Sequence, residues 1–357
     1  MTSEDLSPRS RARGALAGLA VGDAAGFPSM YHRTTRLGWR RSVLWRFAKE
    51  LDDQRVLRFP LPFTLGRPDE LLISATDDSE FAAVAAMILL EADGDYSAQA
   101  LFAGWDKHVV KAGDDIWSGI AERASIVNAR RGLRPPQTGG DNPAHYDDGA
   151  ASRAVAVGVH FAGHPDQAAD VARNLAEITH AEDGVWAAEA MAAPISAAVG
   201  GSALREAVEA GRRRIPTDCW LSRKLITALQ LAEQAASPFD LAAELSDQVA
   251  NQSYSFGTVA PETLASAYAL ALASDGDPMT AIPAAATIAK QADSVPALVG
   301  AICGALAGVD RLPAAWRTRT ATLRGVCVPE LRGVSLSDLA DKLLEGADGA
   351  DHSAPSA

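Results

Sequence analysis

The chain has 357 residues, of which 48% are hydrophobic and 22% are charged. That balance is typical of a soluble globular protein with a large core and argues against a disordered or fibrous chain. The formal net charge of -12 disfavours non-specific binding to nucleic acid, which depends on clustered Lys and Arg.

Helices are the predicted elements, because small residues and leucine dominate and alternation of β-branched residues over five or more positions is hard to find. We therefore predict a mainly helical fold. In chain order, the predicted helices cover residues 9–25, 78–92, 97–110, 115–129, 149–162, 165–179, 184–199, 204–212, 222–235, 239–250, 261–273, 279–290, 293–307 and 336–344.

Three segments interrupt this pattern. Residues 31–74 mix Trp, Phe, Pro and Arg without a helical period, and we expect an irregular excursion packed across the front of the bundle. Residues 132–148 contain paired prolines and glycines and are predicted as a loop. The small, polar residues 346–357 are expected to be a disordered tail, which leaves one domain over residues 1–345.

The sequence also predicts the compartment in which the protein acts. An uncharged apolar run of about 20 residues, as a membrane span needs, is absent, and no secretory signal is apparent at the start. Cys219, Cys303 and Cys327 are odd in number and widely spaced, so they suggest neither a disulfide framework nor a zinc site. We expect a cytoplasmic protein with no membrane or nucleic-acid partner.

Two acidic clusters stand directly before apolar helices: Thr-Asp-Asp-Ser at 76–79, and Asp293 with Ser294. Carboxylates at the mouth of a buried helix need a partner, because desolvating a bare charge is costly. A hard divalent cation such as magnesium or manganese is one such partner. Helix capping is the alternative, since Thr, Asp and Ser are also preferred N-caps. The residues alone leave both readings open.

Five short motifs follow one another between about residues 13 and 310. They are GALAGLAVGDAAG at 14–26, Ala-Thr-Asp-Asp-Ser at 75–79, Asp-Gly-Ala-Ala-Ser-Arg at 148–153, Thr-His at 179–180 and Gln-Ala-Asp-Ser at 291–294. In this order they resemble the ADP-ribosylglycohydrolase family, which includes the glycohydrolase that reactivates dinitrogenase reductase. The resemblance implies an all-α fold, a single compact multi-helix orthogonal bundle of the ADP-ribosylglycohydrolase type.

The resemblance also implies roles for particular residues. It makes Thr76, Asp77, Asp78 and Asp293 the ligands of one magnesium ion, with Ser294 helping a second. Asp77 or Asp78 is then the catalytic residue that positions a water for attack on the anomeric carbon.

The substrate-binding residues that the resemblance implies are Asp148, Gly149, Ala150, Ser152, His180 and Asp23. For His180 and Asp23, a purely structural role at a helix end is the alternative.

Three positions depart from the family pattern. Gln291 replaces an aspartate, so we expect the second ion to be weak or absent. Met30 stands where some members have a glutamate. Asp148 replaces an asparagine beside Asp147, and the two charges would repel a diphosphate unless a metal or Arg153 neutralised them.

Three functions therefore stay open. The first is a magnesium-dependent hydrolase of a ribosyl glycosidic bond, whose default substrate in the family is an ADP-ribosyl-protein or another ADP-ribose conjugate. The second keeps the fold and metal but takes a small nucleoside or ribosyl metabolite, as Asp148 and Met30 suggest. The third is a noncatalytic ADP-ribose-binding or structural relative, which Gln291 favours and the retained Asp77 and Asp293 oppose.

Overall fold

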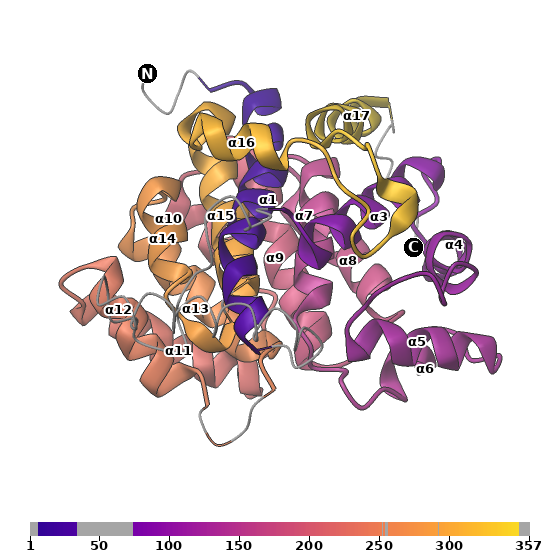
Figure 1. Cartoon of the computed structure of the whole chain (residues 1–357), viewed down its shortest axis with the longest axis horizontal. Helices are drawn as coiled ribbons and strands as arrows, with labels where there is room; N and C mark the ends of the chain where they lie inside the picture. The colour runs from indigo at the N-terminus through magenta and orange to yellow at the C-terminus, as the bar shows by residue number, and fades with distance from the viewer. Residues whose placement is uncertain (1–5, 34–73, 252, 254–255, 292, 350–357) are drawn as a thin grey trace, which may run out of the picture.

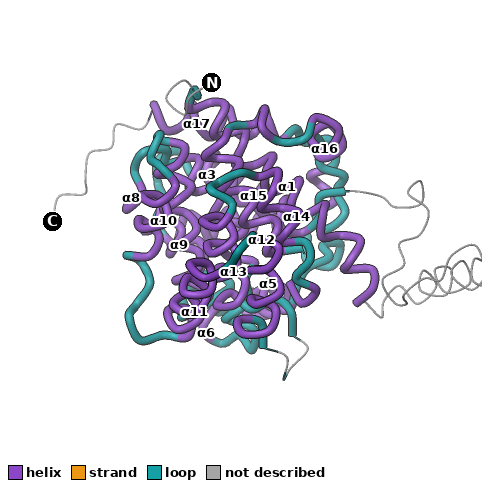
Figure 2. Tube along the Cα trace, turned by 90° about the vertical axis from the view of Figure 1, so that its left-hand side faces the viewer, coloured by secondary structure: helices purple, strands orange, loops and turns teal. Residues whose placement is uncertain are grey.

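The computed structural model describes residues 6–33, 74–251, 253, 256–291 and 293–349 (Figure 1). The side chains of 27–33, 289 and 347–349 lie outside this description. The described residues contain helices and two isolated β-bridges but no strand, which confirms the all-α prediction (Figure 2).

The helices follow one another through short connections. They are α1 (Pro8–Arg33), α3 (Asp77–Glu91), α4 (Ala98–Trp105), α5 (Ile120–Arg130), α6 (Gln137–Gly140), α7 (Gly149–His160), α8 (Pro165–Ala176), α9 (Asp183–Val199), α10 (Leu204–Arg212), α11 (Trp220–Gln234), α12 (Pro238–Glu244), α13 (Ala260–Ala273), α14 (Pro278–Ala285), α15 (Ser294–Ala307), α16 (Ala314–Thr320) and α17 (Leu336–Gly349). The π turns Asp106–Val110 and Leu245–Val249 extend α4 and α12, and 3-10 turns cover Ala289–Gln291, Val309–Arg311 and Pro329–Leu331.

Two predicted helix boundaries are wrong for identifiable reasons. The first helix continues to Arg33 rather than ending at residue 25, because Gly26 does not adopt the left-handed conformation that caps a helix. Helix α5 begins at Ile120 rather than at 115. The preceding residues are held in a loop because the Trp117 N–H donates to the Cys327 carbonyl, at 2.9 Å.

The loop and tail predictions also need correction. The expected loop over 132–148 contains the short helix α6, and α16 was not predicted because its Arg- and Thr-rich sequence lacks an apolar period. Helix α17 runs to Gly349, so the expected tail from 346 is helical at its start. Residues 350–357 and most of the predicted excursion, 34–73, lie outside the described residues.

Helices α1 and α15 lie side by side and antiparallel with their backbones in contact (Figure 1). Glycines at every fourth position of α1 share one helix face, and Gly14 and Gly18 meet Gly304 and Gly300. A methyl group added at Gly18 would lie 2.0 Å from the Gly300 carbonyl oxygen, a separation that no side chain tolerates. Small residues at these positions therefore set the distance between the two helices.

The core surrounds this contact. It is one cluster of buried residues that extends from Ala12 to Leu343, with α7, α9 and α13 packed around α15. Helix α17 packs on α1, where Arg13 pairs with Asp341 at 2.6 Å, so the two ends of the described chain lie together. No described helix combines the length and the apolar character that crossing a membrane requires.

The α1–α15 contact predicts a large cost for any side chain at Gly18. Gly18→Ala should lower the free energy of unfolding by about 3 kcal/mol or more, because overpacking against backbone cannot be relieved by a rotamer change. Gly140→Ala is the control, since a methyl group there meets nothing within 4 Å and should change stability by less than about 1 kcal/mol. Urea denaturation measures both, and equal effects would contradict the close contact.

Candidate active site

Five aspartates from four helices gather at one place, which we call the acidic centre. Asp23 comes from α1, Asp77 and Asp78 from the first turn of α3, and Asp148 and Asp293 from the N-cap positions of α7 and α15. Asp78 interacts electrostatically with the other four. The structure therefore unites the two acidic clusters that stand more than 200 residues apart in the sequence.

The amino ends of α3, α7 and α15 supply these carboxylates. The first N–H groups of a helix lack partners inside the helix, and the helix dipole places partial positive charge there. This partial positive charge lowers the free-energy cost of burying carboxylates at the starts of the three helices. The N-cap residues Thr76, Asp148 and Asp293 make no side-chain capping hydrogen bond to their own helices, so capping does not account for these side chains.

Asp23 holds the turn that carries Asp77 and Asp78. One of its oxygens accepts hydrogen bonds from the Thr76 N–H and the Ser79 hydroxyl, both at 2.7 Å, and the other accepts from the Thr76 hydroxyl at 2.5 Å. Asp23 is fully buried, and this desolvation raises its pKa to about 6 although the hydrogen bonds oppose the shift. The oxygens of the Asp23 carboxylate are thus used to hold this turn.

Glu80, which sequence reasoning passed over, holds a second segment against the centre. Its fully buried carboxylate accepts three backbone N–H bonds at 2.7 to 2.8 Å, from Val326, Cys327 and Val328. The pKa of the Cys327 thiol is raised by burial and also by Asp77 and Glu80, which shows how near this segment lies to the acidic centre. Nothing in the sequence signals this role, because Glu80 directly follows the Thr-Asp-Asp-Ser cluster and its partners are backbone groups.

The acidic centre is a place of unbalanced negative charge. Burial is the largest cause that raises the pKa of Asp77, Asp78 and Asp148 well above the ordinary carboxyl value, and neighbouring carboxylates add to it. Ser152 donates a hydrogen bond to Asp78, and Thr263 donates one to Asp148 at 2.6 Å. Among the described residues, no Lys or Arg forms an ion pair with these carboxylates.

This donor set fits a hard divalent cation. Carboxylate oxygens of like charge, from the buried Asp78 and the half-buried Asp77 and Asp293, with a neighbouring hydroxyl at Thr76, are what magnesium and manganese prefer. Ser294 is buried beside them and supplies a hydrogen bond that opposes the shift in the Asp148 pKa.

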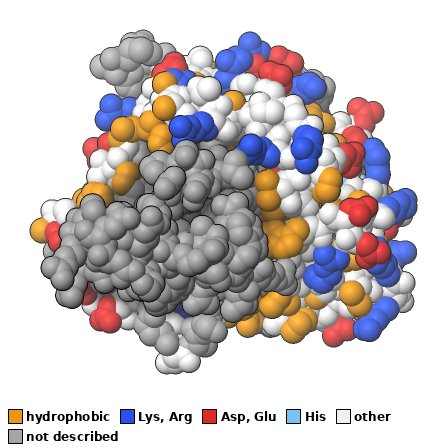
Figure 3. All heavy atoms as spheres, in the orientation of Figure 1, with side chains coloured by type: hydrophobic (Ala, Val, Ile, Leu, Met, Phe, Trp, Pro, Cys, Tyr) orange, Lys and Arg blue, Asp and Glu red, His pale blue; other side chains and the backbone are white. Residues whose placement is uncertain are grey.

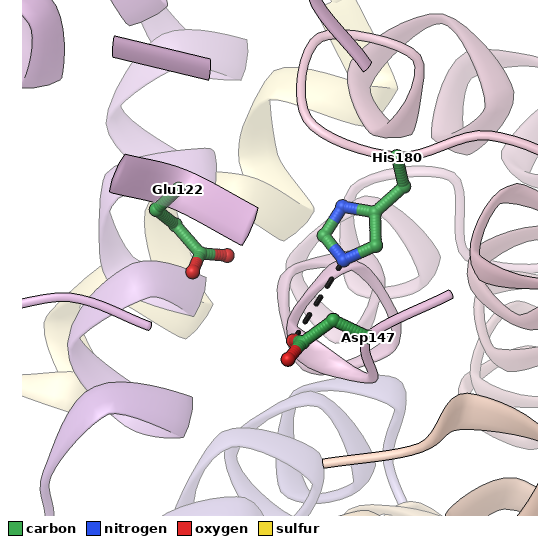
Figure 4. Close-up of side chains that lie close together, drawn as sticks. All are labelled: Glu122, Asp147 and His180. Carbon is green, nitrogen blue, oxygen red and sulfur yellow. Dashed lines mark ion pairs between the residues drawn. The ribbon is translucent and has the colours of Figure 1, made fainter. Parts of the chain in front are cut away.

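A second buried group adjoins the centre and consists of Glu122, Asp147 and His180 (Figure 4). Its ligand atoms all lie within 4.8 Å of one another, the only such set of His, Cys, Asp and Glu in the part of the chain described. Arg153, however, donates to Glu122 Oε1 at 2.7 Å and lies 3.3 Å from His180 Nδ1. The guanidinium ion offsets one of the two carboxylate charges and occupies one oxygen of Glu122, so this group attracts a dication less strongly than the acidic centre does.

The predicted substrate-binding residues are divided between the two groups: Asp23, Asp148 and Ser152 belong to or contact the acidic centre, and His180 belongs to the second group. In Figure 4 the His180 ring points at Asp147, with Nε2 3.8 Å from Oδ1, too far for a hydrogen bond. The ring is fully buried, and Nε2 has no hydrogen-bond partner. Gly149 packs close to Glu122, since an added methyl group would lie 2.8 Å from Oε1, and Ala150 is buried.

Gln291 and Met30 are two of the positions at which the sequence departs from the family pattern. Gln291 is buried and donates through Nε2 to Glu262 Oε2 at 2.6 Å, while its Oε1 has no partner. Lys290 donates to the same Glu262 oxygen at 3.0 Å. Met30 belongs to the part of α1 whose side chains are not described.

Comparisons with known proteins agree with this architecture. The family model described as ADP-ribosylglycohydrolase matches residues 4–352. A solved structure described as an ADP-ribosylglycohydrolase-related protein complex superposes with a TM-score of 0.60 at 21% identity, covering 96% of this chain and 99% of that one. At that identity the likeness shows the fold alone. Among curated proteins, none matched the sequence.

The acidic centre predicts a link between pH, magnesium and stability. Burial raises the carboxyl pKa values, to about 6 for Asp23, so the folded chain binds more protons than the unfolded chain above the ordinary value of 3.8. Without metal, the free energy of unfolding should therefore fall as the pH rises from the ordinary value of 3.8 through the raised carboxyl pKa values. Magnesium competes with those protons, so its stabilising effect should grow over the same window.

Thermal unfolding with and without magnesium between pH 5 and pH 8 checks this link. Asp293→Asn should reduce the magnesium shift, whereas Asp218→Asn, an exposed control paired with Arg223, should not. A magnesium shift that is independent of pH and equal in all three proteins would contradict the assignment.

The Glu80 contact predicts a separate cost. Glu80→Gln replaces one carboxylate oxygen by an amide NH2 group, which cannot accept a hydrogen bond. The variant should lower the free energy of unfolding by about 1.5 to 3 kcal/mol. Urea denaturation measures this, with the exposed Glu233→Gln as control. An unchanged free energy of unfolding would show that the three N–H bonds are not formed.

Proposed function

Because the chain belongs to the ADP-ribosylglycohydrolase family, we propose that it hydrolyses the glycosidic bond at the anomeric carbon of a ribosyl group. Family membership supports a glycohydrolase in general. The finer proposal is that the substrate is an ADP-ribose conjugate, such as an ADP-ribosylated protein, and that magnesium is the cofactor. The observation that carries it is the acidic centre, where buried carboxylates meet without a basic partner among the described residues.

Magnesium fits the centre by the chemistry of its donors. Thr76, Asp77, Asp78 and Asp293 would hold one ion, with manganese as a substitute of similar preference. When bound, the ion would act as a Lewis acid and as a template for the ribose hydroxyls. Gln291 offers a neutral amide oxygen where the family has a charged carboxylate, which supports a single ion rather than two.

The protein's own groups would orient the attacking water. Ser152 donates to Asp78 Oδ1, which holds that carboxylate in one orientation, while the Thr76 hydroxyl, whose proton goes to Asp23, lies 3.1 Å from Asp77 Oδ1. Either carboxylate can then accept a proton from water while the water oxygen bonds to the anomeric carbon. The bond to the leaving atom breaks in the same process, and that atom takes up a proton.

A phosphate-free ribosyl metabolite is the second candidate substrate, and one observation favours it. Arg153 donates to Glu122 rather than to Asp147 or Asp148, so its charge is already balanced. Within the described residues, the acidic residues beside the predicted ribose and phosphate segment therefore lack the counter-charge that a diphosphate would need.

Hydrolysis assays separate these candidates. We expect magnesium-dependent release of ADP-ribose from ADP-ribosylated arginine or serine peptides, and a loss of rate of about 100-fold or more in Asp77→Asn. Asp218→Asn, an exposed substitution far from the first turn of α3 in sequence, is the matched control. Turnover of nucleosides alone would favour the phosphate-free substrate. No turnover of either class, with folding intact, would favour a noncatalytic relative.

A further inference from the structure

The segment after α15 carries a concentration of positive charge that the acidic centre does not use. Residues 311–332 contain five arginines and one acidic residue, Glu330, within a chain of net charge -12. Two of the five are ion-paired: Arg311 with Asp277 at 2.8 Å, and Arg317 with Asp310 at 3.1 Å.

The remaining three arginines, Arg319, Arg324 and Arg332, have no ion pair within the described parts of the chain, and all three are exposed. They line one cavity of about 480 Å³ together with Thr322, Leu323 and Gly333. Figure 3 shows Lys and Arg side chains on the upper part of this face, where Figure 1 places α16 and the segment after it. The arginines without partners are thus the ones that share a cavity.

Backbone pairing fixes the walls of this cavity. The Leu323 N–H donates to the Val334 carbonyl, and the Gly333 N–H donates to the Leu323 carbonyl, both at 2.9 Å. A β-bridge joins Thr322 to Ser335 next to them. Arg324 and Arg332 therefore project from two paired backbone segments, and Arg319 from the end of α16. The charges are held close together although no carboxylate attracts them.

Three neighbouring guanidinium groups repel one another, and an anion that bridges them removes that repulsion. Guanidinium stays charged at all physiological pH values and matches phosphate oxygens with paired N–H donors. A diphosphate carries more negative charge than a monophosphate, which has about -1.5 to -2 near pH 7, and it offers more acceptor oxygens to three guanidinium groups. The chemistry of the cavity thus matches a diphosphate better than a monophosphate.

The cavity adjoins the acidic centre but is distinct from it. Arg324 precedes Cys327 by three residues, so their Cα atoms are at most about 11 Å apart. Cys327 and its neighbours are fixed to Glu80 by backbone hydrogen bonds. The two sites are therefore joined by one anchored segment and carry opposite charge.

We propose that Arg319, Arg324 and Arg332 form a binding site for an anion with two linked phosphates, either a free diphosphate or the diphosphate of a nucleotide. This site goes beyond the proposed hydrolysis and does not depend on it. Its ligand is recognised by charge and by paired N–H donors, and its occupancy should fall as the salt concentration rises, because the cavity is open to solvent.

Calorimetric titration of the full chain with inorganic pyrophosphate tests the proposal. Magnesium-free buffer keeps the acidic centre from competing, because its carboxylates repel the probe. We expect the triple variant Arg319→Gln, Arg324→Gln, Arg332→Gln to bind pyrophosphate at least about tenfold more weakly than the wild type. The double variant Arg311→Gln, Arg317→Gln removes paired arginines of the same segment and should bind within about twofold of the wild type.

Two further probes identify the source of the diphosphate. Tighter binding of ADP than of pyrophosphate, with adenosine not binding, would support a nucleotide ligand, and equal binding would support a free diphosphate. No binding of either probe to the wild type would overturn the proposal. Equal losses in the double and triple variants would also overturn it, since the effect would then be one of overall charge. Far-UV circular dichroism confirms that each variant is folded.

Discussion

The backbone contact between α1 and α15 is the constraint on which the rest of the structure depends. Glycines on both helices let the two helix backbones approach so closely that a side chain at these positions would overlap a carbonyl oxygen. Gly22 lies opposite Pro296, so Asp23, the next residue of α1, lies near the start of α15. The close approach thus brings together the acids of segments that are distant in the sequence, and the packing of the core determines the geometry of the site.

Two buried carboxylates, those of Asp23 and Glu80, hold the residues of the site in place. Asp23 receives hydrogen bonds from Thr76 and Ser79, and Glu80 receives three from 326–328, so the first turn of α3 is held on both sides. Both carboxylates have their charge solvated by protein donors. Among the described residues, Asp77, Asp78 and Asp148 have fewer hydrogen-bond donors than Asp23, and their pKa values are raised well above the ordinary carboxyl value. Supporting and reactive acids are thus distinguished by how completely they are hydrogen-bonded.

Parts of this arrangement were visible in the sequence. The order of the motifs predicted an all-α fold, and their resemblance to a family grouped Asp77 with Asp293. The close contact of Gly14, Gly18 and Gly22 with α15 was not predicted, because the spacing of glycines does not identify a partner helix. The role of Glu80 could not be predicted, because its partners are backbone groups 246 to 248 residues away, and backbone donors leave no trace in side-chain pattern.

The central claim is that the acidic centre, and not the group of Glu122, Asp147 and His180, holds the divalent ion. Anomalous diffraction from crystals grown with manganese tests this most directly, because it locates the ion without reference to activity. The account predicts a peak in contact with Asp77, Asp78 and Asp293. A peak between Glu122 and His180, or no peak in well-ordered crystals at saturating manganese, would contradict it.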